Sequence, residues 1–286
     1  MNEDVGSDWK VQPDYFCVAF LDLLGQSARL DEVARLPLPV QRDSRLHEQL
    51  LHIYEPTLNF HKWFLEALDD VINPAVTGRP QHAGGLAEAL SEDSARSELK
   101  YQVFGDSVFL YVPTDFENPT PSDARLIRGM LLALGCAMVG MMSEGEFPRG
   151  GIDIHVAADL GYGVYGPAAY SAFRLESREA HYPRIVVGSG LCSYLKSIGT
   201  SIPALSEFSG RVVYQDTDDL AVLDYLGETF RQEKLFDPAD VRKAYGRAKA
   251  LLDSYRQKDD THLRTKYGRL MHYFESRVNL WGHRGR

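Results

Sequence analysis

The chain has 286 residues, of which 44% are hydrophobic and 25% charged, and its formal net charge is −9. The length allows one large domain or two small ones. The hydrophobic and charged fractions are typical of a globular protein. The acidic balance excludes a broad nucleic-acid-binding surface, because such a surface needs a surplus of Lys and Arg to meet the phosphates. A small phosphate ligand remains compatible with this charge, since a metal ion and a few local donors can neutralise it.

The sequence predicts neither a targeting segment nor a membrane span. Met1–Lys10 is polar and acidic, unlike a signal peptide. The longest apolar stretch, Met130–Met142, is interrupted by glycines and too short to cross a bilayer, so we expect a buried helix. Cys17, Cys136 and Cys192 lie in apolar contexts without metal-ligand spacing, which is typical of buried thiols in a reducing compartment. We therefore expect a cytoplasmic protein.

The first third of the chain predicts one strand and one long helix. Tyr15–Leu21 is a short run of apolar, aromatic and β-branched residues, which indicates a central strand. Gly25 follows closely, and Ser44–Val71 is predicted to be helical. Residues 73–98 mix Pro, Gly, Ser and charges without periodicity, so we expect a loop there.

A hairpin is predicted next, because the strand-like runs Lys100–Phe104 and Ser107–Pro113 are joined tightly at Gly105 and Asp106. The elements predicted after it are a helix at Ser122–Met142, strands at Gly151–Ala157 and Gly161–Gly166, a helix at Ala168–Ala180, strands at Arg184–Gly188, Val212–Gln215 and Leu220–Asp224, and helices at Pro238–Lys258 and Asp260–Leu280.

This order of strands, hairpins and helices predicts the fold class. It is typical of an α+β fold in which an antiparallel sheet carries helices on one face. We expect residues 1–230 to form the main domain and residues 231–286 to form a C-terminal helical extension packed on it.

Asp22 and Asp106 each stand at the edge of an apolar, strand-like run. A carboxylate in such a place loses hydration unless a cation or a hydrogen-bond donor compensates it. Taken singly, Asp22 fits a helix cap and Asp106 fits a turn. In a split βαββ arrangement, however, the end of the first strand lies beside the turn between the second and third, so the two carboxylates converge. Paired carboxylates of this kind hold divalent metals for phosphoryl chemistry.

The segment Leu23–Ser27 directly follows the first aspartate and begins a helix or a turn. Its backbone N–H groups are suited to hold a triphosphate, as helix N-termini do. Gly25 would let the backbone approach such a ligand closely, although an ordinary turn glycine is the alternative.

Other motifs carry weaker signals. Residues 161–166 satisfy G-x-G-x-x-G, but Pro167 follows at once and no acidic residue ends the next strand, so we interpret these glycines as hairpin and turn residues. The nine histidines form no metal-type pair. The acidic cluster of Asp216, Asp218 and Asp219 is interpreted as a solvated turn.

Several segments, in order along the chain, carry a resemblance to a known family. They are FLDLLG (20–25), VFGDSVFLY (103–111), RGGIDI (149–154), GPAAYSAFRLES (166–177), AHYPRIVV (180–187) and DDLAVLDYL (218–226), followed by a helical C-terminus. In these segments the chain resembles the class III nucleotidyl cyclases, and more specifically the bacterial pyrimidine cyclases of the Pycsar antiphage systems. The resemblance implies a ferredoxin-like, or palm-type, cyclase domain over residues 1–230.

The resemblance also implies a metal site. Asp22 and Asp106 match the two metal-binding aspartates of the family, and Leu23 occupies the position whose backbone carbonyl completes one metal site. Two Mg²⁺ or Mn²⁺ ions would accordingly be the cofactors.

The resemblance also implies contacts to the phosphates and to the base, although some residues depart from the family pattern. The backbone segment that cradles the β- and γ-phosphates is matched by Leu24, Gly25 and Gln26. Gln102 stands where adenylyl cyclases carry a base-reading Lys, and its amide could meet a pyrimidine edge. The Asn-x-x-x-Arg pair of adenylyl cyclases falls on Tyr170 and Arg174, so the Asn is missing. Arg149 and Arg184 are alternative phosphate ligands or structural residues.

By this resemblance we expect a homodimer with active sites at the interface, converting the nucleoside triphosphate UTP into 3′,5′-cyclic UMP and pyrophosphate. The product would act on a separate effector protein in antiphage defence. Cyclisation of CTP to cyclic CMP is one alternative, and a non-catalytic nucleotide-binding domain is another. A polymerase or diguanylate cyclase is less well supported, because FGDSV at residues 104–108 stands in place of a G-G-D-E-F signature.

Overall fold

The computed structural model of the protein describes residues 12–36, 44–72, 99–104, 106–257 and 261–281. The loop expected at residues 73–98 and the turn position Gly105 lie outside the described residues.

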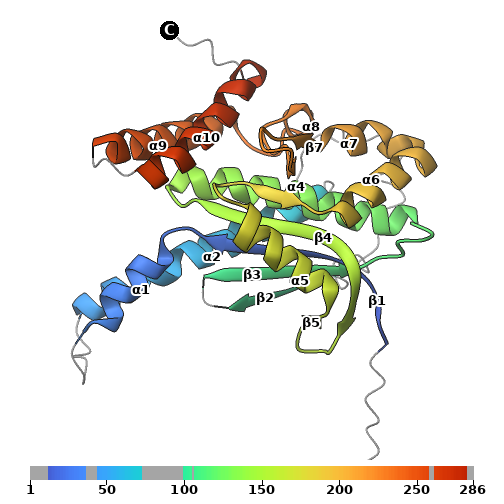
Figure 1. The fold of residues 1–286 in the computed structure, drawn as a ribbon, viewed down its shortest axis with the longest axis horizontal. Coiled ribbons are helices and arrows are strands. Elements are labelled where there is room, and N and C mark those ends of the chain that lie inside the picture. The colour runs from blue at the N-terminus through green and yellow to red at the C-terminus, as the bar shows by residue number, and fades with distance from the viewer. Residues whose placement is uncertain (1–11, 37–43, 73–98, 105, 258–260, 282–286) are drawn as a thin grey trace, which may run out of the picture.

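An eight-stranded sheet runs through the centre of the fold (Figure 1). Its strands are β1 (Asp14–Leu23), β2 (Lys100–Phe104), β3 (Ser107–Pro113), β4 (Pro148–Asp159), β5 (Val164–Tyr165), β6 (Ile185–Val187), β7 (Val213–Gln215) and β8 (Ala221–Leu223). Their order across the sheet is β2-β3-β1-β4-β6-β8-β7, and β5 pairs with β4. Neighbouring strands are antiparallel except β4 and β6, which run parallel. The predicted α+β class with a largely antiparallel sheet is thus confirmed, and the parallel pair departs from it.

The α-helices of the described residues surround this sheet. They are α1 (Gln26–Ala34), α2 (Ser44–Ile72), α4 (Pro121–Glu144), α5 (Pro167–Arg174), α6 (Ser189–Ser201), α7 (Ser206–Arg211), α8 (Glu228–Glu233), α9 (Pro238–Gln257) and α10 (Thr261–Arg277). The sequence pattern did not predict α6, α7 or α8. The helix predicted over Ala168–Ala180 changes character at its end, where Leu175–Glu179 forms a π-helical turn.

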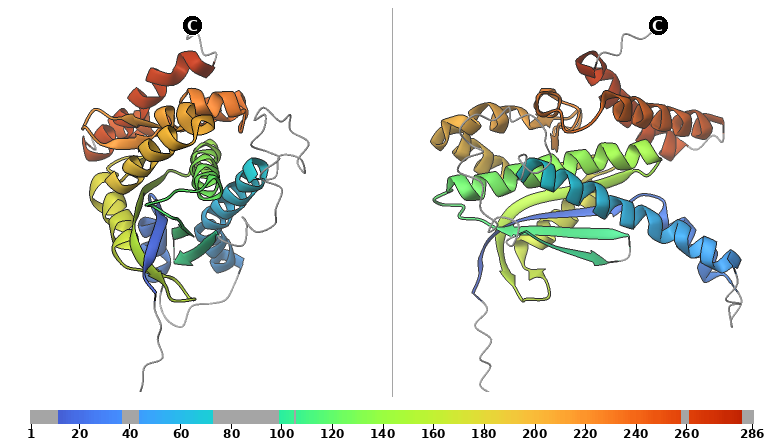
Figure 2. Two further views of the ribbon diagram at one scale, coloured as in Figure 1. Left: turned by 90° about the vertical axis from the view of Figure 1, so that its right-hand side faces the viewer. Right: turned by 180° about the vertical axis from the view of Figure 1, so that it is seen from behind.

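The two faces of β1 are covered by different helices, because successive side chains of a strand point to opposite sides. Cys17, Ala19 and Leu21 belong to the main core with α2 and α4. Val18 and Phe20 face the other way and pack with α5. Figure 2 shows α2 and α4 on one side of the sheet and α5 on the other. The expectation of helices on one face only is therefore wrong.

Helix α4 is the buried helix expected from the apolar stretch Met130–Met142. It begins with a capping box, in which Thr120 and Asp123 exchange hydrogen bonds with each other's backbone, and ends at Gly145 with a left-handed φ of 99°. The helix is long and apolar enough to span a membrane, but 94% of its most apolar window is buried inside the fold. Its apolar surface is thus accounted for by core packing.

The C-terminal helices pack on the same body. Helix α9 lies along α4, and α10 packs against α9 (Figure 1). A single core cluster contains Leu21, Phe230, Val241 and Leu270, which come from both sides of the expected division at residue 230. That division falls inside α8. Within the described part of the chain, the C-terminal helices therefore form an extension that shares the core of the main domain and has no separate core of its own.

Candidate functional site

Asp22 and Asp106 lie together at one edge of the sheet. Asp22 is the second-last residue of β1 and pairs in register with Ser107, the residue after Asp106. The Leu23 N–H donates to the Asp106 carbonyl at 3.3 Å, and Ser107 Oγ donates to Asp22 Oδ1 at 3.3 Å. Burial raises the pKa of Asp22, and the neighbouring negative charge of Asp106 raises it further. The fold therefore brings the two carboxylates into one electrostatic site.

Arg149 is the cation that faces this site. It pairs in register with Asp22 across β1 and β4, and its Nη2 lies 3.4 Å from Asp22 Oδ2. The same nitrogen lies 2.7 Å from Glu176 Oε1. Glu176 belongs to the π-helical turn after α5 and is 2% exposed. Arg149 therefore bridges two carboxylates, one half-buried and one buried.

The Glu176 carboxyl keeps its proton more tightly than a solvated one. Burial raises its pKa to about 7, and the charges of Asp22 and Asp106 act in the same direction, against the lowering effect of Arg149. Glu176 is not predicted as a site residue, because nothing in the segment GPAAYSAFRLES distinguishes its Glu from a surface helix residue.

The segment proposed to cradle phosphates continues directly from β1 into α1. Leu23 is buried at the end of the strand, and the Leu24 N–H donates to the Phe147 carbonyl at 3.2 Å, so this donor is already used. Gly25 has a φ of 91°, a left-handed conformation that favours glycine, and forms the N-cap of α1. The backbone of Gln26 begins α1, whose first N–H groups have no acceptor within the helix. The fold thus places a helix N-terminus beside the carboxylates.

A lysine of α10 is also electrostatically coupled to this region. Lys266 lies on α10 and is half-buried. Burial lowers its pKa to about 8, and the charges of Arg149, Asp22 and Glu176 all act on it. No local sequence pattern reveals such a residue, because its position depends on how α10 packs.

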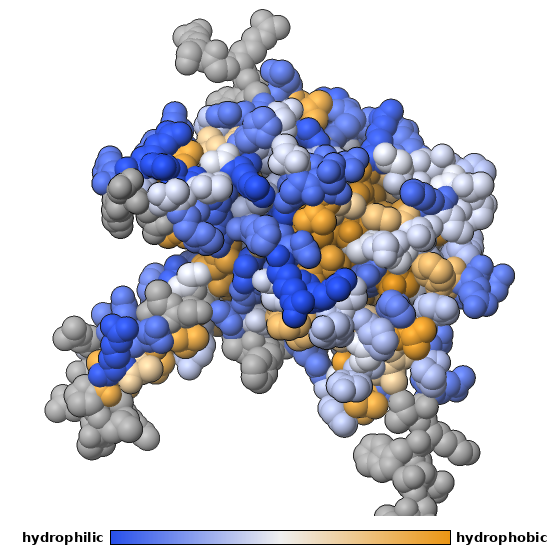
Figure 3. Space-filling view, viewed as in Figure 1, coloured by the Kyte–Doolittle hydropathy of each residue, from blue (hydrophilic) through white to orange (hydrophobic). Residues whose placement is uncertain are grey.

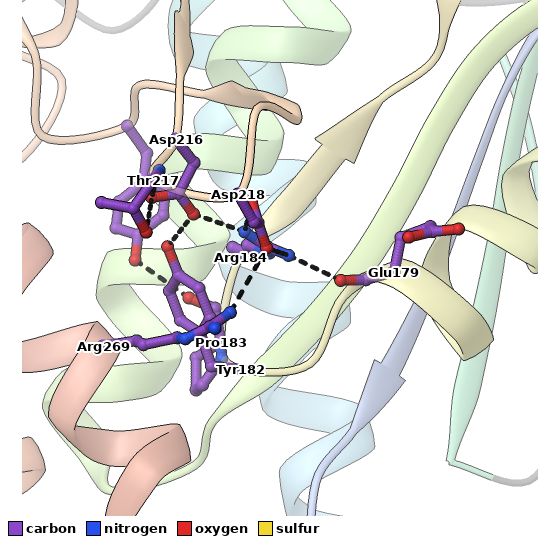
Figure 4. Close-up of polar contacts among 9 residues, drawn as sticks. Glu179, Tyr182, Pro183, Arg184, Asp216, Thr217, Asp218 and Arg269 are labelled. Atoms are coloured by element: carbon purple, nitrogen blue, oxygen red, sulfur yellow. Dashed lines mark hydrogen bonds and ion pairs between the residues drawn. The ribbon is translucent and has the colours of Figure 1, made fainter.

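Arg184 is expected from the sequence to be either a phosphate ligand or a structural residue. Its contacts are those of a buried structural residue. Its side chain is 2% exposed and forms ion pairs with Asp216 and Asp218, while its Nη2 donates to the Glu179 carbonyl at 2.7 Å. Figure 4 shows Arg184 between these groups, with Arg269 approaching Asp218 from α10. Both Nη atoms of the guanidinium are thus engaged, and the interpretation of this acidic cluster as a solvated turn is wrong for Asp216 and Asp218.

Gln102 and Tyr170 line a pocket that does not include the carboxylate pair. This pocket has a volume of about 650 Å³ and lies between β2, the β4–β5 hairpin and α5. The Gln102 amide donates to the Tyr162 carbonyl. Arg174 is exposed on α5, four residues after Tyr170. The G-x-G-x-x-G residues form the β4–β5 hairpin and its exit, as expected, with left-handed φ angles at Gly161 and Gly166.

Within the described ranges, no three His, Cys, Asp or Glu side chains converge as metal ligands. The candidate metal site consequently has two carboxylates, from Asp22 and Asp106, and the backbone around Leu23. Cys17 and Cys136 are buried and Cys192 is partly buried, all three as free thiols. Comparison of the chain with models of protein families and with curated proteins found no match.

Proposed function

We propose that the protein is a pyrimidine nucleotide cyclase that converts UTP into 3′,5′-cyclic UMP and pyrophosphate. The observation that carries the proposal is the convergence of Asp22 and Asp106 beside the helix N-terminus at Gly25. Converging carboxylates suit divalent cations, and a helix N-terminus suits phosphate oxygens. The resemblance of FLDLLG and VFGDSVFLY to class III cyclases supports the same chemistry.

The residues present fit a divalent metal site. Burial raises the pKa of Asp22, the negative charge of Asp106 raises it further, and Arg149 already places a cation against Asp22. Asp22, Asp106 and the Leu23 carbonyl would hold the cations. A pair of bound Mg²⁺ or Mn²⁺ ions would neutralise phosphate charge and lower the pKa of the ribose 3′-hydroxyl.

The chain's own residues would bind and orient the triphosphate. In the proposed reaction the 3′-oxygen bonds to the α-phosphorus, and the bond from the α-phosphorus to the leaving pyrophosphate oxygen breaks. The Arg149 side chain is 24% exposed and suits a phosphate ligand, whereas that of Arg184 is 2% exposed and already forms ion pairs with two carboxylates. The first N–H groups of α1, from Gln26 onward, would donate hydrogen bonds to oxygens of the terminal phosphates. Alignment of this kind accounts for most of the barrier reduction in phosphoryl transfer.

A second copy of the chain is proposed to complete the site. Gln102 and Tyr170 line a pocket that is separate from the carboxylates, as expected if base and metal contacts come from different subunits. The rim of this pocket carries exposed aromatic residues, with Tyr165 76% and Tyr170 61% exposed. Such residues are enriched at protein interfaces. The product would then act on a separate effector protein in the cytoplasm.

Incubation of the purified chain with each nucleoside triphosphate and Mn²⁺ tests the proposal, with cyclic UMP as the expected product. Cyclic CMP as the main product would favour the cytidylate cyclase alternative. Binding of the nucleotide without any conversion would favour a non-catalytic nucleotide-binding domain.

A further inference from the structure

We propose that Lys266 of α10 binds the polyphosphate of the nucleotide, so that the C-terminal helical extension supplies a cation to the active site. This inference rests on the proposed function, because it names a further substrate contact of the same site. It concerns a residue outside the segments that resemble the cyclase core.

Ring packing holds α10 against the strand end where the carboxylates lie. Tyr267, the residue after Lys266, packs edge-on against Phe147 with ring centroids 5.4 Å apart. The Phe147 carbonyl accepts the hydrogen bond of the Leu24 N–H, in the segment between Asp22 and α1. Tyr267 also stacks on Tyr255 of α9 at 5.5 Å, which ties α10 to its neighbour. Lys266 is therefore carried by a helix that is fixed next to the proposed phosphate segment.

The charges around Lys266 are those of the candidate site. Asp22 and Glu176 stabilise its ammonium and Arg149 opposes it, so the ammonium lies within electrostatic reach of all three groups. These groups come from β1, from the π-helical turn and from β4. Lys266 and Arg149, on different elements of the fold, are thus exposed to the same carboxylate charges.

The two cations differ in how they are paired. Arg149 lies 3.4 Å from the Asp22 carboxylate and 2.7 Å from that of Glu176. For Lys266, no carboxylate of the described residues lies within ion-pair distance. Its half-burial makes the charged ammonium less favourable, and its pKa is lowered to about 8. A desolvated ammonium without a paired carboxylate favours an anionic ligand, and a polyphosphate supplies several oxygens.

The position of α10 relative to the start of α1, where we propose that the phosphates bind, agrees with this role. Figure 3 shows the surface hollowed between the α9 and α10 pair above and the α1 and α2 pair below. Figure 1 shows the end of β1 leading into α1 below α9 and α10. A triphosphate held by the start of α1 would consequently face α10.

Calorimetric titration of the full chain with inorganic tripolyphosphate and Mn²⁺ tests the inference without requiring turnover. Lys266→Met should weaken tripolyphosphate binding about tenfold or more, since a hydrogen bond between charged partners is lost. Lys266→Arg should retain affinity to within about threefold. The matched control is Lys249→Met, which removes an exposed lysine of α9. Because Met removes a desolvated charge and keeps the side-chain length, the melting temperature should not fall, and Lys266→Gln provides a second neutral variant.

Equal tripolyphosphate affinity of the wild type and both neutral variants would overturn the inference, as would failure of the wild type to bind tripolyphosphate. If the wild type cyclises UTP, Lys266→Met should raise KM more than it lowers kcat, and an unchanged KM would contradict the inference alone. If the wild type makes no cyclic product, the proposed function fails, while the tripolyphosphate titration still decides the role of Lys266.

Discussion

Arg149 and Asp22 face each other across the paired strands β1 and β4, with Arg149 Nη2 3.4 Å from Asp22 Oδ2. The guanidinium therefore stands against one of the two carboxylates that we assign to divalent cations. A bound metal ion and Arg149 carry charges of the same sign, so they would compete for Asp22. Glu176, at 2.7 Å on the other side, gives Arg149 a second partner when that competition occurs.

Removal of this competitor should strengthen metal binding. We expect Arg149→Met to raise Mn²⁺ affinity about tenfold, because a positive charge is removed from within a few ångströms of the site. Turnover of UTP should nevertheless fall, since the proposed phosphate ligand is lost. Calorimetric titration with Mn²⁺ measures the first effect, and a product assay the second. Weaker Mn²⁺ binding in the variant would contradict the proposed competition.

The two aspartates should be essential for turnover but not for folding. Asp22→Asn and Asp106→Asn should each lower cyclisation at least about a hundredfold, as expected for loss of a group that stabilises charge at the reacting centre. Asp22→Asn should also raise the melting temperature at neutral pH, because burial and Asp106 make the ionised form of Asp22 less favourable in the fold.

The matched control for these variants is Asp31→Asn, which removes an exposed carboxylate from nearby α1. Product assays and thermal unfolding of all three variants check the prediction. Normal cyclisation by both Asp22→Asn and Asp106→Asn would refute the metal-site assignment.

Glu176 should make stability depend on pH. Its pKa is raised from 4.5 to about 7 by burial, so the folded state binds the proton more tightly than the unfolded state. Ionisation therefore lowers the free energy of unfolding as the pH rises from 4.5 to about 7. Glu176→Gln should lack this loss, and urea unfolding across that pH range measures the difference.

The exposed Glu144 at the end of α4 offers a control, as Glu144→Gln removes a carboxylate without changing a buried contact. If the wild type and Glu176→Gln showed parallel stability curves over that range, the buried carboxyl would not titrate as described.

The ion pairs of Arg184 should contribute to stability through their burial. Arg184→Met removes the partner of Asp216 and Asp218 and should lower the free energy of unfolding by about 3–5 kcal/mol. Arg211→Met, which breaks an exposed pair with Glu207 within α7, should change it by only about 0.5 kcal/mol. Urea unfolding compares the two variants, and equal losses would contradict a role for burial.

A triple variant separates pairing from packing at this cluster. Combining Arg184→Met with Asp216→Asn and Asp218→Asn should recover part of the lost stability, because the two carboxylates that lose Arg184 are then neutral. A further loss in the triple variant would mean that packing of the Arg184 side chain outweighs its charge.

Much of the fold could be predicted from local sequence patterns. The run from Tyr15 to Leu21 is apolar and rich in aromatic and β-branched residues, and it lies in the central strand β1, between β3 and β4. Asp22 and Asp106 could be paired in advance, because a strand end and the following hairpin turn meet by topology alone. Their proximity needs no knowledge of side-chain packing.

Other features of the site depend on contacts between distant segments. In the π-helical turn that carries Glu176, the Ala180 N–H donates to the Leu175 carbonyl, five residues earlier. The hydrophobic periodicity of the sequence does not predict this extra residue in the turn. The placement of Lys266 depends on the packing of α10, in which Tyr267 contacts Phe147. The partners of Arg184 are likewise distant in sequence, so they look like turn residues when viewed locally.

The most direct test of the central claim is identification of the products formed from UTP and Mn²⁺ by the wild type and by Asp106→Asn. The account predicts 3′,5′-cyclic UMP and pyrophosphate in equal amounts from the wild type, and neither from the variant. Absence of cyclic product from the wild type with any of the nucleoside triphosphates would contradict the account, as would undiminished cyclisation by Asp106→Asn.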